Sequence, residues 1–335
     1  SWIIENIINN KGGLHNRVTR SIRLKPFSLY ETKCYLKAQN ISLNNRQILE
    51  LYIVFGGVPL YWSFIRKGYS AHQNIDELCF QSDAPLINEF NRLFQSLFQE
   101  PKPYIDLIRV LAKHRYGVSQ SELIIKAKLP DGGNTIRKLN QLEEAGFITS
   151  LIPYGHKNRG IYYVIDDEYS LFFLRWIESN LKTITKKAIN KGFWMSQSNR
   201  ASWKSWVGLA FESICYKHID QVRKALNIDP GAIAGTWRYS PKIQDDQKGA
   251  QIDLLFDRPD KVITLCEIKF SGTPFVIDKE YSQKLLQKIE IFKKRTKTKK
   301  QLFLAMITSN GLKPTIYSEE IITNQVTLED LFKEN

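Results

Sequence analysis

The stretch that decides the fold is residues 249–270, GAQIDLLFDRPDKVITLCEIKF. Two apolar runs, at 252–256 and 262–265, flank the tetrapeptide DRPD at 257–260. Proline and aspartate favour tight turns, and short apolar runs bounded by turn residues are typical of strands. The stretch therefore predicts a β-hairpin, and we interpret the rest of the chain outward from it.

Three charged residues lie on this hairpin: Asp253 on the first strand, and Glu267 and Lys269 on the second. Because Glu267 and Lys269 are two residues apart, they point to the same face of their strand. Two carboxylates can hold Mg²⁺ or Mn²⁺ while leaving positions for water and phosphate. A lysine can steady the attacking water or the charge that develops on phosphorus. The trio predicts catalytic residues for phosphodiester hydrolysis, with Asp253 and Glu267 as metal ligands.

The trio alone has a plainer interpretation. Charged residues make up 24% of the chain, so an aspartate and a distant Glu-x-Lys also arise by chance. A lysine beside a glutamate is usually a surface ion pair that contributes little.

The segments around the hairpin favour the first interpretation. A helix is predicted at 205–226, where apolar residues recur near helical spacing, and a strand at 232–239 precedes the hairpin. A lysine-rich amphipathic helix at 279–297 and an apolar strand at 301–308 follow it. The predicted order is α-β-β-β-α-β.

This order, together with the trio, resembles the core of the PD-(D/E)xK nuclease superfamily. Asp253 matches the first acidic residue of that motif, and Glu267-Ile268-Lys269 matches its ExK element. The resemblance also implies that Glu212, on the first helix, helps to hold the metal.

The charge of the chain favours a polyanionic partner. Its 48 Lys and Arg against 34 Asp and Glu give a net charge of +14. Lysine and arginine bind a phosphate backbone with release of its counterions, so we expect DNA as the partner. In the basic run at 284–300 we expect Lys284 and Lys288 to contact the DNA backbone. The alternatives are a merely basic protein and a solvated basic surface.

Residues 101–180 have the pattern of a small DNA-binding module. Three helices, at 104–114, after Ser119 and at 135–145, precede two strands at 147–152 and 160–165. Three helices and a basic hairpin predict a winged helix-turn-helix. The alternative is a packing module between domains.

The third helix of this module is expected to enter the major groove. We expect its inner face to hold Ile136, Leu139 and Leu142. The polar residues Thr135, Arg137, Lys138 and Gln141 are expected to face outward. On the loop between the two strands, Lys157 and Arg159 are expected to touch phosphate or the minor groove.

The first hundred residues resemble the end of the ATPase module of the archaeal-type ATPase family, an AAA+ and STAND-like branch of P-loop proteins. The resemblance rests on a loop arginine, Arg17, an RLxPF strand at 23–27, and a GGxPxY turn at 56–61. It implies that Arg17 approaches a nucleotide; the alternative is a surface ion pair. No GxxxxGK[ST] occurs in the chain, so we expect no ATP hydrolysis unless an ATPase core is supplied elsewhere.

The predicted fold class is therefore mixed α/β with several domains. Residues 1–100 are interpreted as the end and helical lid of an AAA+-type ATPase module, residues 101–180 as the winged helix, and residues 181–335 as a restriction-endonuclease-like domain. Because the chain begins at Ser1 within an apparently structured segment, we interpret it as a fragment or a truncated reading frame.

The predicted function is that of a DNA-interacting C-terminal portion of an AAA+-type ATPase with a magnesium-dependent nuclease site. The alternative is a non-catalytic DNA-binding or regulatory module, or a remnant that depends on a separate ATP-binding core. Four cysteines without CxxC spacing predict free, mostly buried thiols and no zinc. No apolar run approaches the length of a membrane span, so we expect a cytoplasmic protein.

Overall fold

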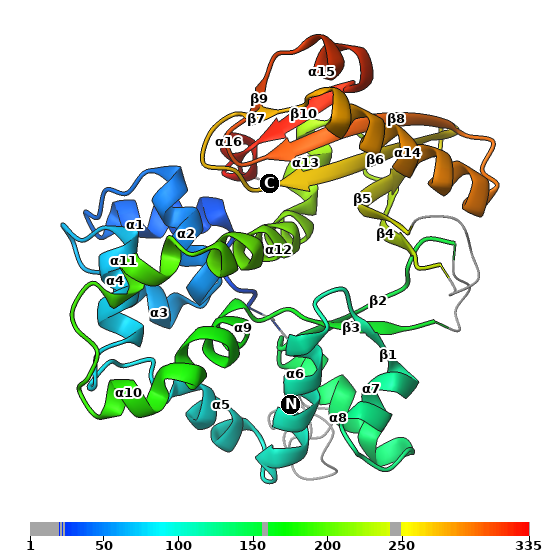
Figure 1. The fold of residues 1–335 in the computed structure, drawn as a ribbon. Coiled ribbons are helices and arrows are strands. Elements are labelled where there is room, and N and C mark those ends of the chain that lie inside the picture. The colour runs from blue at the N-terminus through cyan, green and yellow to red at the C-terminus, as the bar shows by residue number, and fades with distance from the viewer. Residues whose placement is uncertain (1–19, 21, 23, 156–159, 242–248, 335) are drawn as a thin grey trace. The chain divides into compact units, whose positions relative to one another are not determined.

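The structure is a computed structural model that describes residues 20, 22, 24–155, 160–241 and 249–334. It is a mixed α/β protein, which confirms the coarse fold class (Figure 1). The chain divides into two units. The first contains Ser1–Phe27, Glu50–Leu151 and Ile161–Asn199, and the second contains Ser28–Leu49, Ile152–Gly160 and Arg200–Asn335.

The second unit is built on a five-stranded mixed sheet with the order β10-β8-β6-β5-β4 (Figure 1). Strands β6, β8 and β10 are parallel, whereas β5 is antiparallel to both of its neighbours. The strands are β4 (Ile233–Tyr239), β5 (Ala250–Asp257), β6 (Val262–Lys269), β8 (Gln301–Thr308) and β10 (Asn324–Thr327). The strands predicted at 232–239 and 301–308 are confirmed, and β10 was not predicted.

The predicted hairpin is formed by β5 and β6. Asp257 pairs with Ile263, and the register continues to the pair Leu254 and Cys266. The turn closes with the Arg258 N–H donating to the Val262 carbonyl at 3.0 Å, and Lys261 takes a left-handed backbone with φ of 63°. The turn residues at 257–260 thus act as their chemistry predicts.

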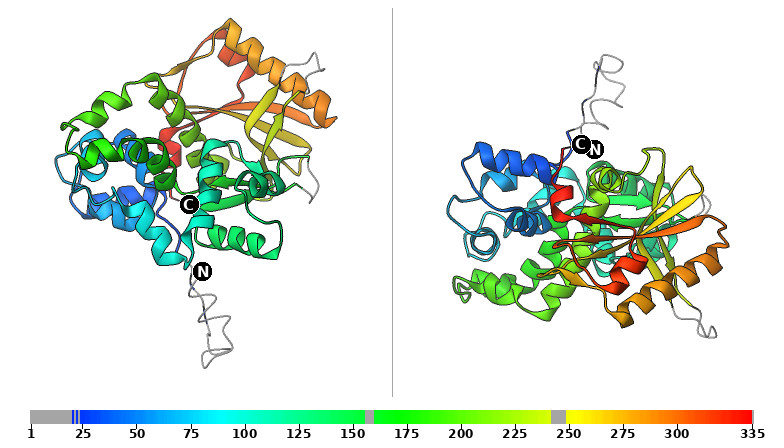
Figure 2. Two further views of the ribbon diagram at one scale, coloured as in Figure 1. Left: turned by 60° about the horizontal axis from the view of Figure 1, so that its bottom comes forward. Right: turned by 90° about the horizontal axis from the view of Figure 1, so that it is seen from above.

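Helix α14 (Lys279–Thr296) covers one face of this sheet, along which it lies in both views of Figure 2. Ile263 and Leu265 of β6 alternate with residues of the opposite face, as side chains of a strand must. They join a buried cluster with α14 that includes Trp237, Ile252, Leu255, Leu285, Phe292, Leu304 and Met306. The core of the second unit therefore lies between the sheet and α14.

Helix α12 (Ala201–Lys217) packs against β6, and its Phe211 ring lies 5.7 Å from that of Phe270. The single helix predicted at 205–226 is wrong in one respect: it consists of α12 and α13 (Ile219–Ala225). The break falls at His218, whose backbone angles, φ −101° and ψ 35°, are not helical.

An N-terminal segment also belongs to the second unit. Helix α1 (Leu29–Ala38) begins with a capping box between Ser28 and Glu31, and α2 (Asn45–Phe55) begins in the same unit. The Leu29 N–H donates to His218 Nε2 at 2.9 Å, so α1 is anchored where α12 ends. The remaining elements of the unit are β7 (Phe275–Val276), β9 (Leu312–Lys313), α15 (Ile316–Ile321) and α16 (Leu328–Leu331).

The first unit contains a helical part with an aromatic core. Its helices are α3 (Pro59–Ser63), α4 (Ala71–Cys79), α5 (Glu89–Leu97), α9 (Glu168–Phe172), α10 (Leu181–Thr185) and α11 (Phe193–Ser198), with a π-helical turn at Phe173–Ile177. Stacked rings include Phe90 on Phe173 and Phe80 on Trp194.

The strand expected at 23–27 is not formed in the described residues, because 24–28 has no strand partner. Instead, the Phe27 N–H donates to the Gly57 carbonyl at 2.7 Å, and the Phe27 carbonyl accepts from the Tyr52 hydroxyl at 2.6 Å. The backbone N–H and carbonyl of Phe27 are therefore satisfied by the GGxPxY turn and helix α2.

The rest of the first unit has the three helices and the hairpin that the sequence predicts. They are α6 (Pro101–Lys113), α7 (Gln120–Lys126), α8 (Gly133–Glu144), β2 (Ile148–Leu151) and β3 (Tyr162–Ile165), with β1 (Val118–Ser119) beside β3. Ser119 caps α7 by accepting from the Glu122 N–H.

The predicted faces of α8 are partly wrong. Thr135 and Gln141 are buried, whereas Ile136 is 37% exposed. The buried positions, with Leu139 and Leu142, follow helical spacing. The Thr135 hydroxyl donates to the Pro130 carbonyl at 2.7 Å, and Gln141 accepts from the Tyr104 hydroxyl. Local hydrogen bonds thus allow polar side chains on the inner face.

No helix within the described ranges is long and apolar enough to cross a membrane. The cysteines are free; Cys34 is exposed, and Cys79, Cys215 and Cys266 are buried. Free and mostly buried thiols are what the sequence predicts.

Candidate active site

Asp253 lies where β5 separates from β6. Beyond the pair Leu254 and Cys266 the ladder stops. In its place, the Asp253 carboxylate accepts the Ile268 N–H at Oδ2, 3.0 Å away. This contact fixes Asp253 between the ends of the two strands, next to Glu267.

A β-bulge aims this side chain. Gly235 of β4 pairs with Leu255, but Trp237 pairs with Ile252, so β5 has one extra residue at this point. Ile252 and Leu255 both face the α14 core although residues three apart on a regular strand point to opposite faces. Bulges re-aim side chains and occur often beside active sites. The bulge at 253–254 therefore positions Asp253.

Glu267 is the buried centre of the site, with 3% of its surface exposed. Its Oε1 receives the Tyr281 hydroxyl at 2.8 Å and lies 2.8 Å from Lys269 Nζ. Lys288 Nζ donates to Oε1 at 2.9 Å and to Oε2 at 2.7 Å. Burial by itself raises the pKa of Glu267, but the two ammonium groups outweigh burial and lower it. Glu267 is thus held as a carboxylate.

The two carboxylates interact with each other. Burial, followed by the charge of Glu267, raises the pKa of Asp253 to about 6. Gln251 Nε2 donates to its Oδ1 at 3.2 Å. Mg²⁺ commonly takes one or two carboxylates from a protein and fills its other positions with water and phosphate oxygens. A half-buried aspartate beside a buried glutamate fits this requirement.

Lys269 remains protonated in this setting. Burial lowers its pKa, but the Glu267 carboxylate outweighs burial and raises it above the ordinary value. Lys269 is therefore a hydrogen-bond donor and a fixed positive charge, not a proton acceptor.

Arg46 fixes the end of the strand that carries Lys269. Its guanidinium lies 3.9 Å from the centre of the Phe270 ring, and its Nη1 donates to the Ser271 carbonyl at 3.0 Å. The same Nη1 reaches the Ser309 hydroxyl at 3.3 Å. Arg46 therefore joins the segments that follow β6 and β8.

Glu212 lies on α12, one turn before Cys215. Burial raises the pKa of Cys215, and the charges of Glu212 and Asp253 add to this effect. In the part of the chain that the structure describes, no three His, Cys, Asp or Glu side chains lie close enough together to hold one metal ion. Glu212 therefore lies near Cys215, whose pKa the charge of Asp253 also raises.

The residues expected to bind nucleic acid lie in different settings. Arg137 and Lys138 on α8 both donate to Asn134 Oδ1, at 3.3 and 3.2 Å. Lys284 is exposed and pairs with Glu280 at 2.6 Å. Lys288 turns inward to Glu267. Arg17, Lys157 and Arg159 lie outside the described residues.

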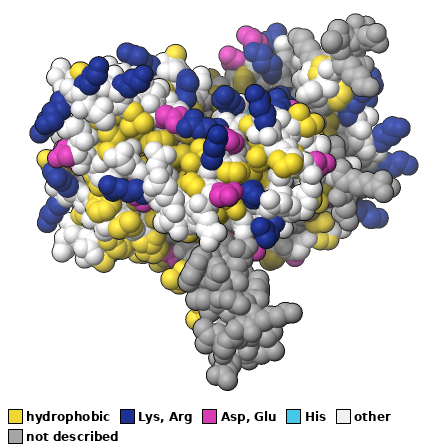
Figure 3. Space-filling model, turned by 90° about the horizontal axis from the view of Figure 1, so that it is seen from below, with side chains coloured by type: hydrophobic (Ala, Val, Ile, Leu, Met, Phe, Trp, Pro, Cys, Tyr) yellow, Lys and Arg dark blue, Asp and Glu magenta, His cyan; other side chains and the backbone are white. Residues whose placement is uncertain are grey.

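Basic side chains are spread over the face of the molecule drawn in Figure 3. They lie singly or in small groups among hydrophobic and acidic side chains.

Sequence patterns missed Tyr281 as a residue of the site and assigned Lys288 to a DNA contact instead. Both lie on the stripe of α14 that also carries Leu285 and Phe292. The spacing 281, 285, 288, 292 is that of a single helix face. Two polar residues within an otherwise apolar stripe were the signal of a buried polar partner.

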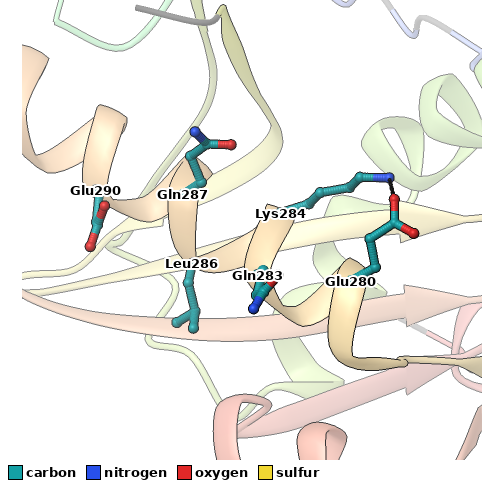
Figure 4. A pocket seen from close by; sticks show the side chains of 6 residues that line it. All are labelled: Glu280, Gln283, Lys284, Leu286, Gln287 and Glu290. Carbon is teal, nitrogen blue, oxygen red and sulfur yellow. Dashed lines mark ion pairs between the residues drawn. The ribbon is translucent and has the colours of Figure 1, made fainter.

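A surface depression lies on the exposed side of α14 (Figure 4). Its lining residues are Glu280, Gln283, Lys284, Leu286, Gln287 and Glu290. All six come from one helix, and none belongs to the strands that carry the trio. The chemistry of the candidate site is therefore separate from this depression.

Comparisons with protein families, curated proteins and solved structures found no match for this chain. The function of the site is accordingly inferred from its geometry.

Proposed function

We propose that this chain is a DNA-binding, metal-dependent phosphodiesterase whose active site is Asp253, Glu267 and Lys269. One observation carries the proposal: two strands bring a half-buried aspartate, a buried glutamate and a protonated lysine together at the point where β5 leaves β6. Opposed carboxylates with an adjacent cation suit the binding of a divalent metal and a phosphate group.

Asp253 and Glu267 would hold Mg²⁺ or Mn²⁺. Such an ion, when bound, stabilises charge on the phosphate and makes a bound water more acidic. In hydrolysis the water oxygen forms a bond to phosphorus while one phosphorus–oxygen bond to a sugar breaks. The leaving sugar oxygen then takes up a proton. Lys269, held protonated beside Glu267, donates hydrogen bonds to the attacking water or to the phosphate oxygens.

The other parts of the chain are assigned by inference in the same way. We infer that the second unit is a restriction-endonuclease-like domain, supported by its order of elements. We infer that α6 to α8 with β1 to β3 form a winged helix whose α8 presents the exposed Arg137 to DNA. The helices before them would be an ATPase lid, in which Arg17 serves a nucleotide only when an ATPase core is present. The net charge of +14 supports a DNA partner.

One observation favours a second candidate, a DNA-binding or regulatory module that breaks no bond. Both oxygens of Glu267 accept hydrogen bonds from Lys288. A carboxylate neutralised in this way is also typical of a structural ion pair inside a protein. The two candidates differ in whether a metal ion binds at Asp253.

The test is cleavage of plasmid, linear and branched DNA in Mg²⁺, Mn²⁺ or EDTA. We expect metal-dependent cutting by the wild-type chain and a loss of at least about 100-fold in Asp253→Asn, since a metal ligand matters at least as much as the groups that orient it. Asp260→Asn is the matched control, because Asp260 lies in the hairpin turn and pairs with Arg258. DNA binding by the wild type without cutting in either metal would overturn the nuclease and favour the second candidate.

A further inference from the structure

Lys288 is a counter-ion of Glu267 at the candidate metal site. Its ammonium bridges the carboxylate, at 2.9 Å from Oε1 and 2.7 Å from Oε2 of Glu267. It comes from α14, not from the strands that carry the trio. About a third of its side chain is exposed, 30% against 4% for Glu267, so the lysine can reach solvent without unpacking the core.

Most acceptor sites of Glu267 are already used. An ionised carboxylate offers about four lone-pair sites. Oε1 has Tyr281, Lys269 and Lys288 as partners, and Oε2 has Lys288. A divalent ion bound to Glu267 needs one of these sites at a distance of about 2.0 to 2.6 Å. The ion would bind at Oε2, which has fewer partners than Oε1, and the charge of the Lys288 ammonium 2.7 Å from Oε2 opposes it there.

Lys288 is the partner best placed to leave. Lys269 and Lys288 are about equally exposed, 31% and 30%. The Lys269 ammonium, however, also lies over the Tyr281 ring, 6.0 Å from its centre, whereas Lys288 reaches Oε2 from α14 at 2.7 Å. Its departure also removes a positive charge that repels the incoming ion, whereas loss of the Tyr281 contact would not.

We propose that Lys288 is an exchangeable cation, which holds Glu267 when no metal is bound and leaves Oε2 when a divalent ion binds. This inference rests on the proposed function. The displaced ammonium stays at the edge of the site, where an oxygen of a DNA phosphate is its natural partner. Metal binding and phosphate binding would then support each other through one side chain.

The test is calorimetric titration of the full chain with Mn²⁺. Lys288→Met is expected to bind Mn²⁺ at least about tenfold more tightly than the wild type, the scale of one charge-assisted hydrogen bond. Lys284→Met is the matched control, because Lys284 lies one turn earlier on α14 and pairs with the exposed Glu280 (Figure 4). The affinity of this control should match that of the wild type.

The outcomes separate this inference from the proposed function. Wild-type binding that disappears in Asp253→Asn, together with equal affinity in Lys288→Met, would leave the metal site intact and overturn the exchange. If neither the wild type nor Lys288→Met binds Mn²⁺, the metal site and the exchange both fail. Binding by Lys288→Met alone would support the exchange, with Lys288 as the group that blocks the metal.

Thermal unfolding gives a second readout if Lys288→Met folds less well. In EDTA the variant should melt below the wild type, because the buried Glu267 has lost a cation. Added Mn²⁺ should raise its melting temperature by more than it raises that of the wild type. An equal shift in both proteins would mean that Lys288 has a purely structural role, and would overturn the proposal.

Discussion

At the scale of single residues, His218 shows how one buried ring joins segments far apart in the chain. It is 2% exposed, its Nε2 accepts the Leu29 N–H at 2.9 Å, and Nδ1 lies 2.8 Å from the Ile214 carbonyl. Because Nε2 accepts a hydrogen bond, Nδ1 carries the proton of the neutral ring. A second proton would confront the Leu29 N–H. Burial lowers the pKa of His218 to about 4, with Lys217 adding to the effect.

This pKa predicts a loss of stability in mild acid. The unfolded chain takes up a proton on His218 near pH 6.5, and the folded chain does so only near pH 4. The contribution of the neutral His218 ring to the free energy of unfolding is complete above about pH 6.5. It falls between pH 6.5 and 4 and amounts to about 3 kcal/mol at most. When the pH is lowered from 7 to 4.5, the free energy of unfolding of the wild type, measured in urea, should fall by about 2 kcal/mol more than that of His218→Gln. Parallel pH profiles for the two proteins would contradict the prediction.

The residues of the candidate site were only partly accessible to sequence reasoning. Asp253, Glu267 and Lys269 were predicted because their chemistry and spacing on one hairpin are visible in the chain. Lys288 was predicted to lie on a DNA-facing surface, yet it contacts Glu267. Its direction depends on how α14 is rotated on the sheet, which is set by tertiary packing and not by the local pattern.

At the scale of elements, the turn at Gly56 and Gly57 leaves no room for a side chain at either position. A Cβ at Gly57 would lie 2.0 Å from the Phe27 carbonyl oxygen, which is backbone and cannot move aside. Gly57→Ala should therefore destabilise the first unit by about 3 kcal/mol or more. Gly133→Ala is the control in the same unit, because a Cβ there meets nothing within 4 Å. Urea unfolding followed in both variants decides the matter, and equal midpoints would contradict this account.

The elements themselves were predicted according to the strength of their local signal. Strands β5, β6 and β8 contain apolar runs and helix α14 has an amphipathic pattern, and their predicted positions hold. Strand β10 is four residues, NQVT, and is defined by its parallel pairing with β8. A short polar strand acquires its identity from its neighbour, so periodicity alone does not reveal it.

At the scale of the whole molecule, the second unit is assembled from three separate segments of the chain. Ser28–Leu49 contributes Arg46, which fixes the end of β6, and Leu29, which binds His218. Contacts that span 189 and 225 residues carry no local signature, so the sequence offered no means of assigning this segment to the sheet. The fold of the candidate site thus depends on a part of the chain remote from the hairpin.

The charge of the whole chain predicts how DNA binding should respond to salt. With a net charge of +14, affinity should fall steeply as salt rises, with a slope of about 0.9 in the double-logarithmic plot for each phosphate contact. Lys293 and Lys294 are exposed in the last turn of α14. If they contact phosphates, replacing both with Gln should reduce the slope by about two, measured by fluorescence anisotropy in EDTA so that no metal-dependent cutting occurs.

The control is the removal of equal charge from another element of the same unit. Lys33 and Lys37 are exposed on α1, and their replacement with Gln changes the net charge by the same amount. If α14 contacts DNA directly, the salt slope should fall when Lys293 and Lys294 are replaced and stay unchanged when Lys33 and Lys37 are replaced. The double replacements on α14 and on α1 could instead weaken DNA binding equally and leave the salt slope unchanged. In that case the overall charge of +14 attracts the DNA, and α14 is not the surface that binds it.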